Sequence, residues 1–308
     1  MRLLLKPVEL AWRGTNRVRR ALFRAGVLRS RTLPRPVISV GNISVGGSGK
    51  TPVTVAIARE LLERGKRVAI LSRGYGREST NAMMIVDSAN PSAFGDEPVL
   101  LWQSARGADV VVGADRWSAA KSYLRDHDCD VFLMDDGFQH LRLARDLDIV
   151  IDQPDARWLR DSPRALEHAD AILRRLEGGE PRSERDYRLS IAPSALRFGE
   201  SVAEPDSLRG KRVFSFAGLA RNEQFFDMLR NLGADLVAAR GFADHHRYDR
   251  SEVLQMRRDA ASEGAEAIIT TAKDFVKIGE PGLGVLEVEA RIDPRDRFFD
   301  QVFSVFRS

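Results

Sequence analysis

A glycine-rich stretch near the start of the chain has the residue types that bind nucleotide phosphates. It reads "NISVGGSGKTPVT" over residues 42–54. In such a loop the backbone N–H groups surround a phosphate, a lysine reaches the β and γ oxygens, and a threonine hydroxyl can ligate Mg²⁺. The usual pattern has glycine where this chain has Ser44, and a glycine-rich structural turn is the alternative. We predict a P-loop for a nucleotide and Mg²⁺ at Gly46, Gly47, Ser48, Gly49, Lys50 and Thr51.

A pair of acidic residues follows a short apolar run later in the chain. The run "VFLM" at residues 131–134 leads directly into Asp135 and Asp136. P-loop proteins hold Mg²⁺ with carboxylates at the end of a buried strand, directly or through water. Turn-forming aspartates that only end a strand are the alternative. Beside a P-loop, we interpret Asp135 and Asp136 as metal-binding acids.

Two further stretches place polar side chains where strands end or helices begin. "LSRGYGR" carries Arg73 and Tyr75, which could grip a phosphate and stack on a sugar, or simply form a polar loop. "GDEPVLLW" carries Asp96 just ahead of Pro98 and an apolar helical run. Asp96 is therefore either a helix N-cap or a catalytic carboxylate, and the sequence leaves both open.

Two adjacent histidines follow a predicted strand in "GFADHHRYD", which contains His245 and His246. Adjacent side chains of an extended segment point to opposite sides, so the pair is a poor metal chelate. One catalytic histidine beside one bystander is the more plausible interpretation. A surface loop with two idle histidines is the alternative.

The surrounding elements alternate between strand and helix. "RPVISVGN" predicts a buried strand, and "TPVTVAIARELLERG" a helix that ends at Gly65, which is the context that a P-loop requires. From about residue 210 the pattern restarts, with strands in "KRVFSFAGLA", "ADLVAAR" and "AEAIITTAKD", helices at 222–232 and 251–263, and a last helix after Pro294. We expect an α/β fold with two parallel layered domains, 31–205 and 206–308.

The first 30 residues predict a basic amphipathic helix. Residues 1–35 hold ten basic side chains against Glu9, a net charge of +9, which leaves −5 on the other 273 residues of a chain with total charge +4. On a helix, an apolar stripe lies opposite a basic side formed by Lys6, Arg13, Arg17, Arg20 and Arg24; the stripe consists of Leu4, Val8, Ala11, Thr15, Val18, Leu22 and Ala25. The helix either packs on its own domain or lies on a membrane surface, and the arginine excess favours the membrane.

Charge and cysteine content indicate which partners and which cellular compartment the protein has. A basic arm on a slightly acidic body indicates an anionic surface met by one end, and not nucleic acid. Cys129 is the single cysteine, so no intrachain disulfide forms, which favours a reducing compartment. No apolar run approaches the ~18 residues of a spanning helix, and the start lacks the features of a signal peptide. Nothing in the sequence indicates an obligate protein partner.

Six motifs taken together resemble one enzyme family, the tetraacyldisaccharide 4′-kinases of lipid A synthesis. They occur in order over most of the chain: "SVGGSGKTP", "LSRGYGR", "GDEP", "DDGFQH", "FADHH" and "TTAKDFVK". The resemblance implies transfer of the ATP γ-phosphate to the 4′-hydroxyl of an acylated glucosamine disaccharide. It also implies two α/β/α domains of the Rossmann-like, P-loop NTPase type with the active site between them. A membrane-associating helix (residues 1–30) and a place on the cytoplasmic face of the inner membrane are implied as well.

The resemblance assigns roles residue by residue. Lys50 and Thr51 match the family's P-loop, and Asp135 and Asp136 match its metal-binding acids. Asp96 matches the carboxylate that activates the acceptor hydroxyl, and His245 matches the histidine paired with it. The residues that resemble contacts to the lipid headgroup are Arg73, Tyr75 and Arg116.

Two stretches depart from the family pattern. "TTAKDFVK" has Ala272 where the family usually has glutamate. "LRDSPRALEHAD" replaces a longer glycine-containing loop, which leaves Arg160 and Arg164 without an assigned role.

Two other functions are compatible with parts of the sequence. A partitioning-type P-loop ATPase would also pair a "GGxGKT" loop with a membrane helix, but its signature lysine is Val45 here. That ATPase would dimerise around ATP without forming a phosphorylated product. A small-molecule kinase with an incidental basic helix would act fully on a water-soluble acceptor.

Overall fold

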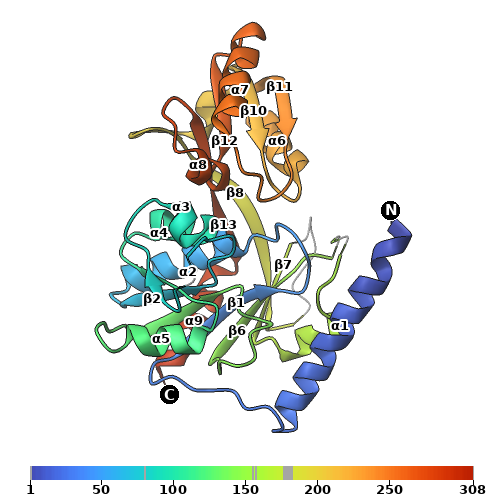
Figure 1. Cartoon of the computed structure of the whole chain (residues 1–308), viewed down its shortest axis with the longest axis vertical. Helices are drawn as coiled ribbons and strands as arrows, with labels where there is room; N and C mark the ends of the chain where they lie inside the picture. The colour runs from blue at the N-terminus through green and yellow to red at the C-terminus, as the bar shows by residue number, and fades with distance from the viewer. Residues whose placement is uncertain (1, 80, 155, 157, 176–182, 308) are drawn as a thin grey trace. The chain divides into compact units, whose positions relative to one another are not determined.

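The computed structural model describes residues 2–79, 81–154, 156, 158–175 and 183–307, and the side chains of the first helix are described from Trp12 onward. The residues divide into two compact units (Figure 1). The first unit contains residues 1–191 together with 290–308, and the second contains residues 192–289.

The first unit is built on a sheet with strand order β3-β4-β2-β5-β1-β6-β7-β8. Neighbouring strands are parallel from β4 to β8, whereas β3 is antiparallel to β4. Parallel strands buried on both faces need continuous apolar runs, which is what "VISV", "VAIL" and "VFLM" supply. The bounds are β1 Val37–Asn42, β2 Val68–Ser72, β3 Met84–Ile85, β4 Asp109–Val112, β5 Val131–Asp135, β6 Leu147–Asp152, β7 Ala171–Arg174 and β8 Asp186–Phe198.

Helices follow the strands of this sheet and pack on them. α2 lies against β1, β2 and β5, while α4 and α5 lie against β4. Because β1, β2 and β5 run in parallel, the loops after them meet at one edge of the sheet. The helical segments are α2 Lys50–Glu63, α3 Pro91–Phe94, α4 Asp96–Ser104, α5 Arg116–Tyr123, α9 Arg295–Phe303 and the 3₁₀ turns Pro163–His168 and Ser304–Phe306.

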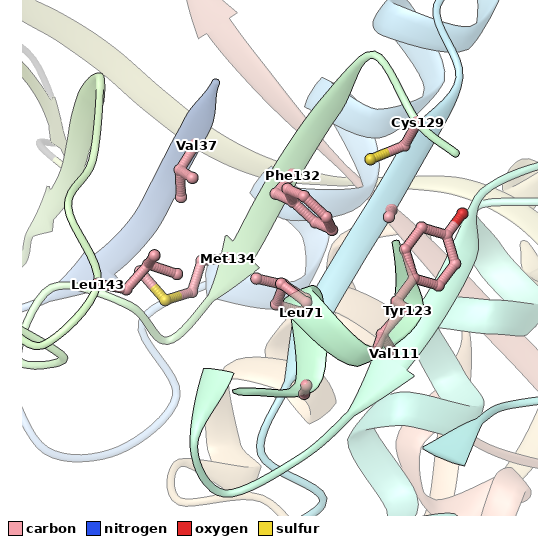
Figure 2. Close-up of a cluster of buried hydrophobic side chains, with 11 residues drawn as sticks. Val37, Leu71, Val111, Tyr123, Cys129, Phe132, Met134 and Leu143 are labelled. Carbon is pink, nitrogen blue, oxygen red and sulfur yellow. The ribbon is translucent and has the colours of Figure 1, made fainter. Parts of the chain in front are cut away.

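A cluster of buried hydrophobic side chains from β1, β2, β4, β5 and α5 stabilises the strands that carry the predicted site (Figure 2). Leu71 of β2, Val111 of β4 and Phe132 of β5 are fully buried in it. Tyr123 of α5 packs edge-on against Phe132 with ring centroids 6.0 Å apart, and its hydroxyl donates to the Asp109 carboxylate at 2.5 Å. Close packing of this kind holds the strand ends in defined positions.

The second unit has the parallel strand order β11-β10-β12-β13. The predicted strands and the helices near 222–232 and 251–263 are present. The stretch "AEAIITTAKD" is not all strand, because β12 ends at Thr271, whose hydroxyl accepts from the Asp274 N–H at 3.0 Å and caps a new helix, α8. The bounds are β9 Ser201–Ala203, β10 Arg212–Ala217, α6 Asn222–Asn231, β11 Asp235–Gly241, α7 Arg250–Ser262, β12 Ala267–Thr271, α8 Ala272–Ile278 and β13 Gly284–Asp293.

The division into units differs from the expected ranges 31–205 and 206–308. β8 and β13 each run from one unit into the other, so the chain leaves the first unit at residue 192 and returns to it at 290. The C-terminal helix α9 then packs in the first unit, where the Phe298 ring lies 5.2 Å from Tyr187 and Arg295 pairs with Glu60 at 2.5 Å. Sequence alternation shows where strands and helices occur but not to which unit a returning segment belongs.

The N-terminal helix α1, Arg2–Arg24, contacts the first unit by its polar side. Asn16 and Arg20 are buried, while Val18 is 58% exposed and Leu22 36% exposed. Arg20 lies opposite the apolar stripe, as expected, and on this side it contacts Asp161 and Phe138 of the first unit. The stripe positions Leu4, Val8 and Ala11 lie outside the described side chains. Within the described part of the chain, no helix has the length and apolar character needed to cross a membrane.

Candidate active site

The predicted P-loop joins the end of β1 to the start of α2. Gly49 occupies the N-cap of α2 with φ 91°, a left-handed conformation, and a Cβ there would lie 3.1 Å from the Ile191 side chain. Glycine is therefore required at this position. No side-chain cap closes this helix end, so its first-turn N–H groups are natural donors to an anion. Lys50 is the first residue of α2, and its Nζ lies 3.6 Å from Asp136 Oδ1.

Asn42, the last residue of β1, explains why serine is accepted at position 44. Its side-chain nitrogen donates to the hydroxyls of Ser44 at 3.2 Å and Ser48 at 2.7 Å, and all three residues are buried. Gln139 donates to the backbone oxygen of Asn42 at 2.9 Å. Two hydroxyls in the loop thus share one amide, which holds the loop in shape without the usual first glycine.

The two predicted metal-binding acids lie at the end of β5, beside the P-loop. Asp135 is buried and accepts from the Thr54 hydroxyl of α2 at 3.1 Å. Burial raises the pKa of Asp135 to about 7, and the negative charges of Glu97 and Asp136 add to the rise. Asp136 has φ 53°. Burial alone would raise the pKa of Asp136, but the charges of Lys50 and Arg160 hold it well below its usual range.

Arg160, which the sequence left without a role, binds Asp136. Its Nη1 donates to Asp136 Oδ2 at 3.1 Å, and its Nη2 donates both to Asp136 Oδ1 and to the side-chain oxygen of Asn42. One guanidinium therefore joins an acid at the end of β5 to the residue that orders the P-loop. Arg164, by contrast, is exposed on a 3₁₀ turn.

Asp96 and the predicted substrate loop are close neighbours in the fold. α4 begins at Asp96, with Gly95 at the N-cap position, so Asp96 is in the first helical turn and not the cap itself. A Cβ on Gly95 would lie 2.8 Å from the Tyr75 backbone oxygen, so the start of α4 and the 73–77 loop touch here. Arg73 and Tyr75 have exposed side chains, and Asp96 is half-buried.

Arg116 interacts electrostatically with His140 and with the two acids at the end of β5, Asp135 and Asp136. Burial lowers the pKa of Arg116 to about 10; the charge of Asp136 opposes the fall and that of Arg73 adds to it. Burial also lowers the pKa of His140 to about 4, and the charge of Arg116 lowers it further. Within the described residues the buried Nε2 of His140 has no hydrogen-bond partner. Three predicted residues, Arg116, Asp135 and Asp136, are thus within electrostatic reach of one another.

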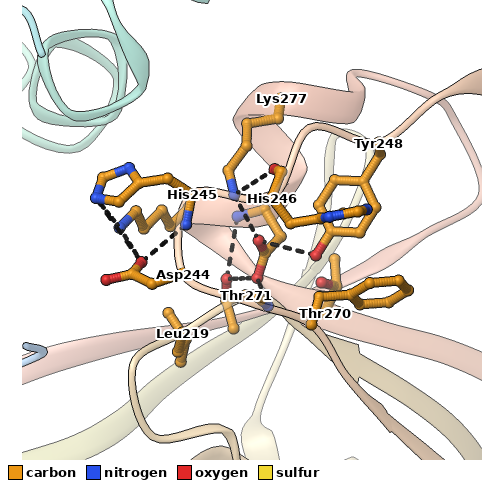
Figure 3. A network of polar contacts seen from close by, with 12 residues as sticks. Leu219, Asp244, His245, His246, Tyr248, Thr270, Thr271 and Lys277 are labelled. Atoms are coloured by element: carbon orange, nitrogen blue, oxygen red, sulfur yellow. Dashed lines mark hydrogen bonds and ion pairs between the residues drawn. The ribbon is translucent and has the colours of Figure 1, made fainter. Parts of the chain in front are cut away.

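In the second unit, His245 sits on a loop held by α8 (Figure 3). Lys273 donates to the Asp244 carboxylate at 2.8 Å and lies 3.4 Å from His245 Nε2. An ammonium group has only donors, so this contact is a hydrogen bond when Nε2 of His245 is the acceptor.

The adjacent His246 is structural. Its ring stacks on Phe242 with centroids 4.6 Å apart, and its Nε2 lies 3.1 Å from Glu252. The loop is further tied to the buried Asp274, which accepts from the Tyr248 hydroxyl at 3.1 Å and from Lys277 at 2.9 Å. His246 is therefore held by its ring stacking and by Glu252, whereas a catalytic role for His245 stays a prediction.

The oxygen donors at the strand ends suit a magnesium ion. Magnesium is usually held by one or two carboxylates, with substrate phosphates and water completing its shell. Asp135 and Asp136 are two neighbouring carboxylates whose repulsion a cation would relieve, and Thr51 is the second residue of α2. No group of three or more His, Cys, Asp or Glu that could hold a metal ion occurs among the described residues.

Sequence comparison places the chain in a known family. Residues 1–306 match the family described as Tetraacyldisaccharide-1-P 4'-kinase. The chain belongs to the tetraacyldisaccharide-1-P 4′-kinase family.

Relatives and a solved structure agree with this membership. The tetraacyldisaccharide 4'-kinase of Pelobacter propionicus is 41% identical over 307 residues, covering 89% of this chain and 82% of the relative. That of Syntrophus aciditrophicus is 35% identical over 349 residues, covering 99% and 93%. The crystal structure of "apo" form LpxK from Aquifex aeolicus in complex with ATP superposes with a TM-score of 0.82 at 30% identity, covering 99% of each chain.

Membership in the tetraacyldisaccharide-1-P 4′-kinase family confirms the α/β fold, the ATP-dependent kinase activity and the cofactors ATP and Mg²⁺. The partitioning-type ATPase is left without support. Sequence reasoning missed four site residues: Asn42, Glu97, His140 and Arg160. Asn42, Glu97 and His140 lie inside quoted motifs, whereas Arg160 reaches Asp136 through a contact 24 positions away that no local pattern signals.

Proposed function

We propose that this kinase transfers the γ-phosphate of ATP to the 4′-hydroxyl of a tetraacylated glucosamine disaccharide 1-phosphate, in lipid A biosynthesis at the cytoplasmic face of the inner membrane. The observation that carries the proposal is the convergence at one sheet edge of a P-loop lysine, two acids, and the loop of Arg73 beside Asp96. An acceptor that brings a phosphate and sugar hydroxyls suits that combination of charges.

Each residue has a distinct task in the proposed reaction. Lys50 binds the β and γ phosphate oxygens, and Thr51, Asp135 and Asp136 would hold Mg²⁺, which would supply positive charge to the phosphates. Arg73 and Arg116 attract the anionic headgroup, and the exposed Tyr75 ring offers a face to the sugar.

A sugar hydroxyl is a weak nucleophile, so a base must take its proton as the phosphoryl group arrives. We assign this base to Asp96, and we assign to His245 the hydrogen bond that orients the Asp96 carboxylate. Support comes from the motifs, since Asp96 of "GDEP" and His245 of "FADHH" match the carboxylate and the histidine that the family pairs. Asp96 belongs to the first unit and His245 to the second.

The outward side of α1 supports attachment to the membrane. Trp12, Val18 and Leu22 are exposed on this helix, and Val27 and Leu28 are exposed just after it. Apolar side chains gathered near an excess of arginine suit the surface of an anionic bilayer, where the helix lies in the interface without crossing it.

This attachment predicts a loss of vesicle binding when the outward side is made polar. The double substitution Val18→Ser with Leu22→Ser should weaken binding to anionic vesicles by about tenfold or more, since two aliphatic side chains lose their burial in lipid. High salt should weaken binding of the unmodified protein, because exposed charges are screened. Vesicle sedimentation measures both effects.

The matched control removes equally exposed apolar groups elsewhere. Val202 and Leu254, 57% and 43% exposed, lie in the second unit, and their double serine variant should bind vesicles normally. If the α1 variant and the control bind anionic vesicles equally well, α1 has only a structural role.

A further inference from the structure

Helix α1 is joined to the first unit by a buried polar contact. Arg20 Nη2 donates to Asp161 Oδ2 at 2.7 Å, with side chains that are 10% and 1% exposed. It also donates to the Phe138 backbone oxygen at 3.3 Å, and its guanidinium lies over the Phe138 ring at 4.1 Å. One turn earlier, Asn16 donates to the backbone oxygen of Arg160 at 2.7 Å. A membrane anchor alone has no need of such a contact, since its apolar side would suffice.

The residues held by α1 form one wall of the P-loop. We call residues 158–161 the bridging segment. The N–H groups of Arg160 and Asp161 donate to the Ile43 oxygen at 2.9 and 3.2 Å, and the Val45 N–H donates to the Trp158 oxygen at 2.9 Å. The bridging segment therefore forms backbone hydrogen bonds with Ile43 and Val45, where β1 ends and the P-loop begins.

The same segment reaches the metal-binding acid. The Arg160 side chain binds Asp136 and Asn42, and Asn42 in turn binds the hydroxyls of Ser44 and Ser48. Phe138, which Arg20 covers, lies two residues after Asp136. Hydrogen bonds thus connect Asn16 and Arg20, through the bridging segment, both to the P-loop and to Asp136.

We propose that the inward side of α1 positions the P-loop and Asp136 through the bridging segment. Asn16 and Arg20 are positioning residues for ATP binding, and this role needs no lipid. The two sides of α1 have separate functions, because Val18 lies about 200° around the helix from Arg20. Removing the whole helix would disturb both functions at once, whereas single substitutions separate them.

The test measures nucleotide binding in lipid-free solution. Arg20→Gln should weaken binding of a fluorescent ATP analogue with Mg²⁺ by about tenfold, because it leaves Asp161 buried without its charge partner. Amide hydrogen exchange should speed up in residues 42–50, 134–138 and 158–161, and stay unchanged in the second unit. Arg20→Lys, which keeps the charge, should restore part of the affinity.

Two further variants keep the test decisive. Asn16→Ala removes one hydrogen bond without a buried charge, so it should fold and show a smaller effect of the same kind. Arg19→Gln removes the same charge one position away, from a half-buried side chain, and should match the wild type in affinity and exchange. Wild-type affinity and exchange in folded Arg20→Gln and Asn16→Ala, or general acceleration of exchange across both units, would overturn the proposal.

Discussion

Lys50→Ala lowers the turnover of the kinase by about a hundredfold or more. Lys50 begins α2 at the glycine N-cap, and its ammonium lies 3.6 Å from Asp136. In the proposed reaction this charge faces the transferred phosphoryl group. That charge stabilises the transition state more than bound ATP, so kcat should fall more than ATP affinity.

Steady-state kinetics with detergent-dispersed acceptor measure this effect. Lys211→Ala is the control: Lys211 forms an exposed pair with Glu266 at 3.1 Å in the second unit, and its loss should leave kcat unchanged. Near-normal turnover in Lys50→Ala would mean that residues 46–51 are not the phosphate-binding loop.

Asp96→Asn and His245→Ala each lower turnover by about a hundredfold while ATP affinity stays close to normal. Asparagine keeps the shape of the carboxylate but cannot accept a proton. Alanine at 245 removes the imidazole that is proposed to orient the Asp96 carboxylate. Because the two side chains are proposed to act as a unit, the double variant should be little worse than the poorer single one.

Single-turnover kinetics with saturating ATP separate this chemistry from binding. Asp126→Asn, which changes an exposed aspartate of the same unit, serves as the control and should react normally. Losses that multiply fully in the double variant would argue against the pair. Normal turnover in Asp96→Asn would show that Asp96 is not the general base but only a residue of the first turn of α4.

The parts of the site that follow from local spacing could be predicted from the sequence. Gly49, Lys50 and Thr51 are set by the strand, loop and helix around them, and Asp135 follows directly from the end of its strand. In these places a few neighbouring residues decide both the backbone shape and the direction of the side chain.

The remaining parts depend on contacts between distant segments. Arg160 meets Asp136 only because the bridging segment pairs with Ile43, which no periodicity reveals. Helical periodicity places Arg20 opposite the apolar stripe, but it does not show that this polar side packs against Asp161 and the Phe138 ring. Likewise, the return of α9 to the first unit depends on packing against Tyr187, far away in sequence.

The most direct test of the account is to identify the product. The kinase is incubated with Mg²⁺, γ-labelled ATP and tetraacylated glucosamine disaccharide 1-phosphate in detergent, and the lipid is analysed by chromatography and phosphorus NMR. We predict one labelled lipid carrying a new phosphate monoester at the 4′ position, and none with Lys50→Ala. ATP hydrolysis without a labelled lipid, or label on another position or acceptor, would contradict the account.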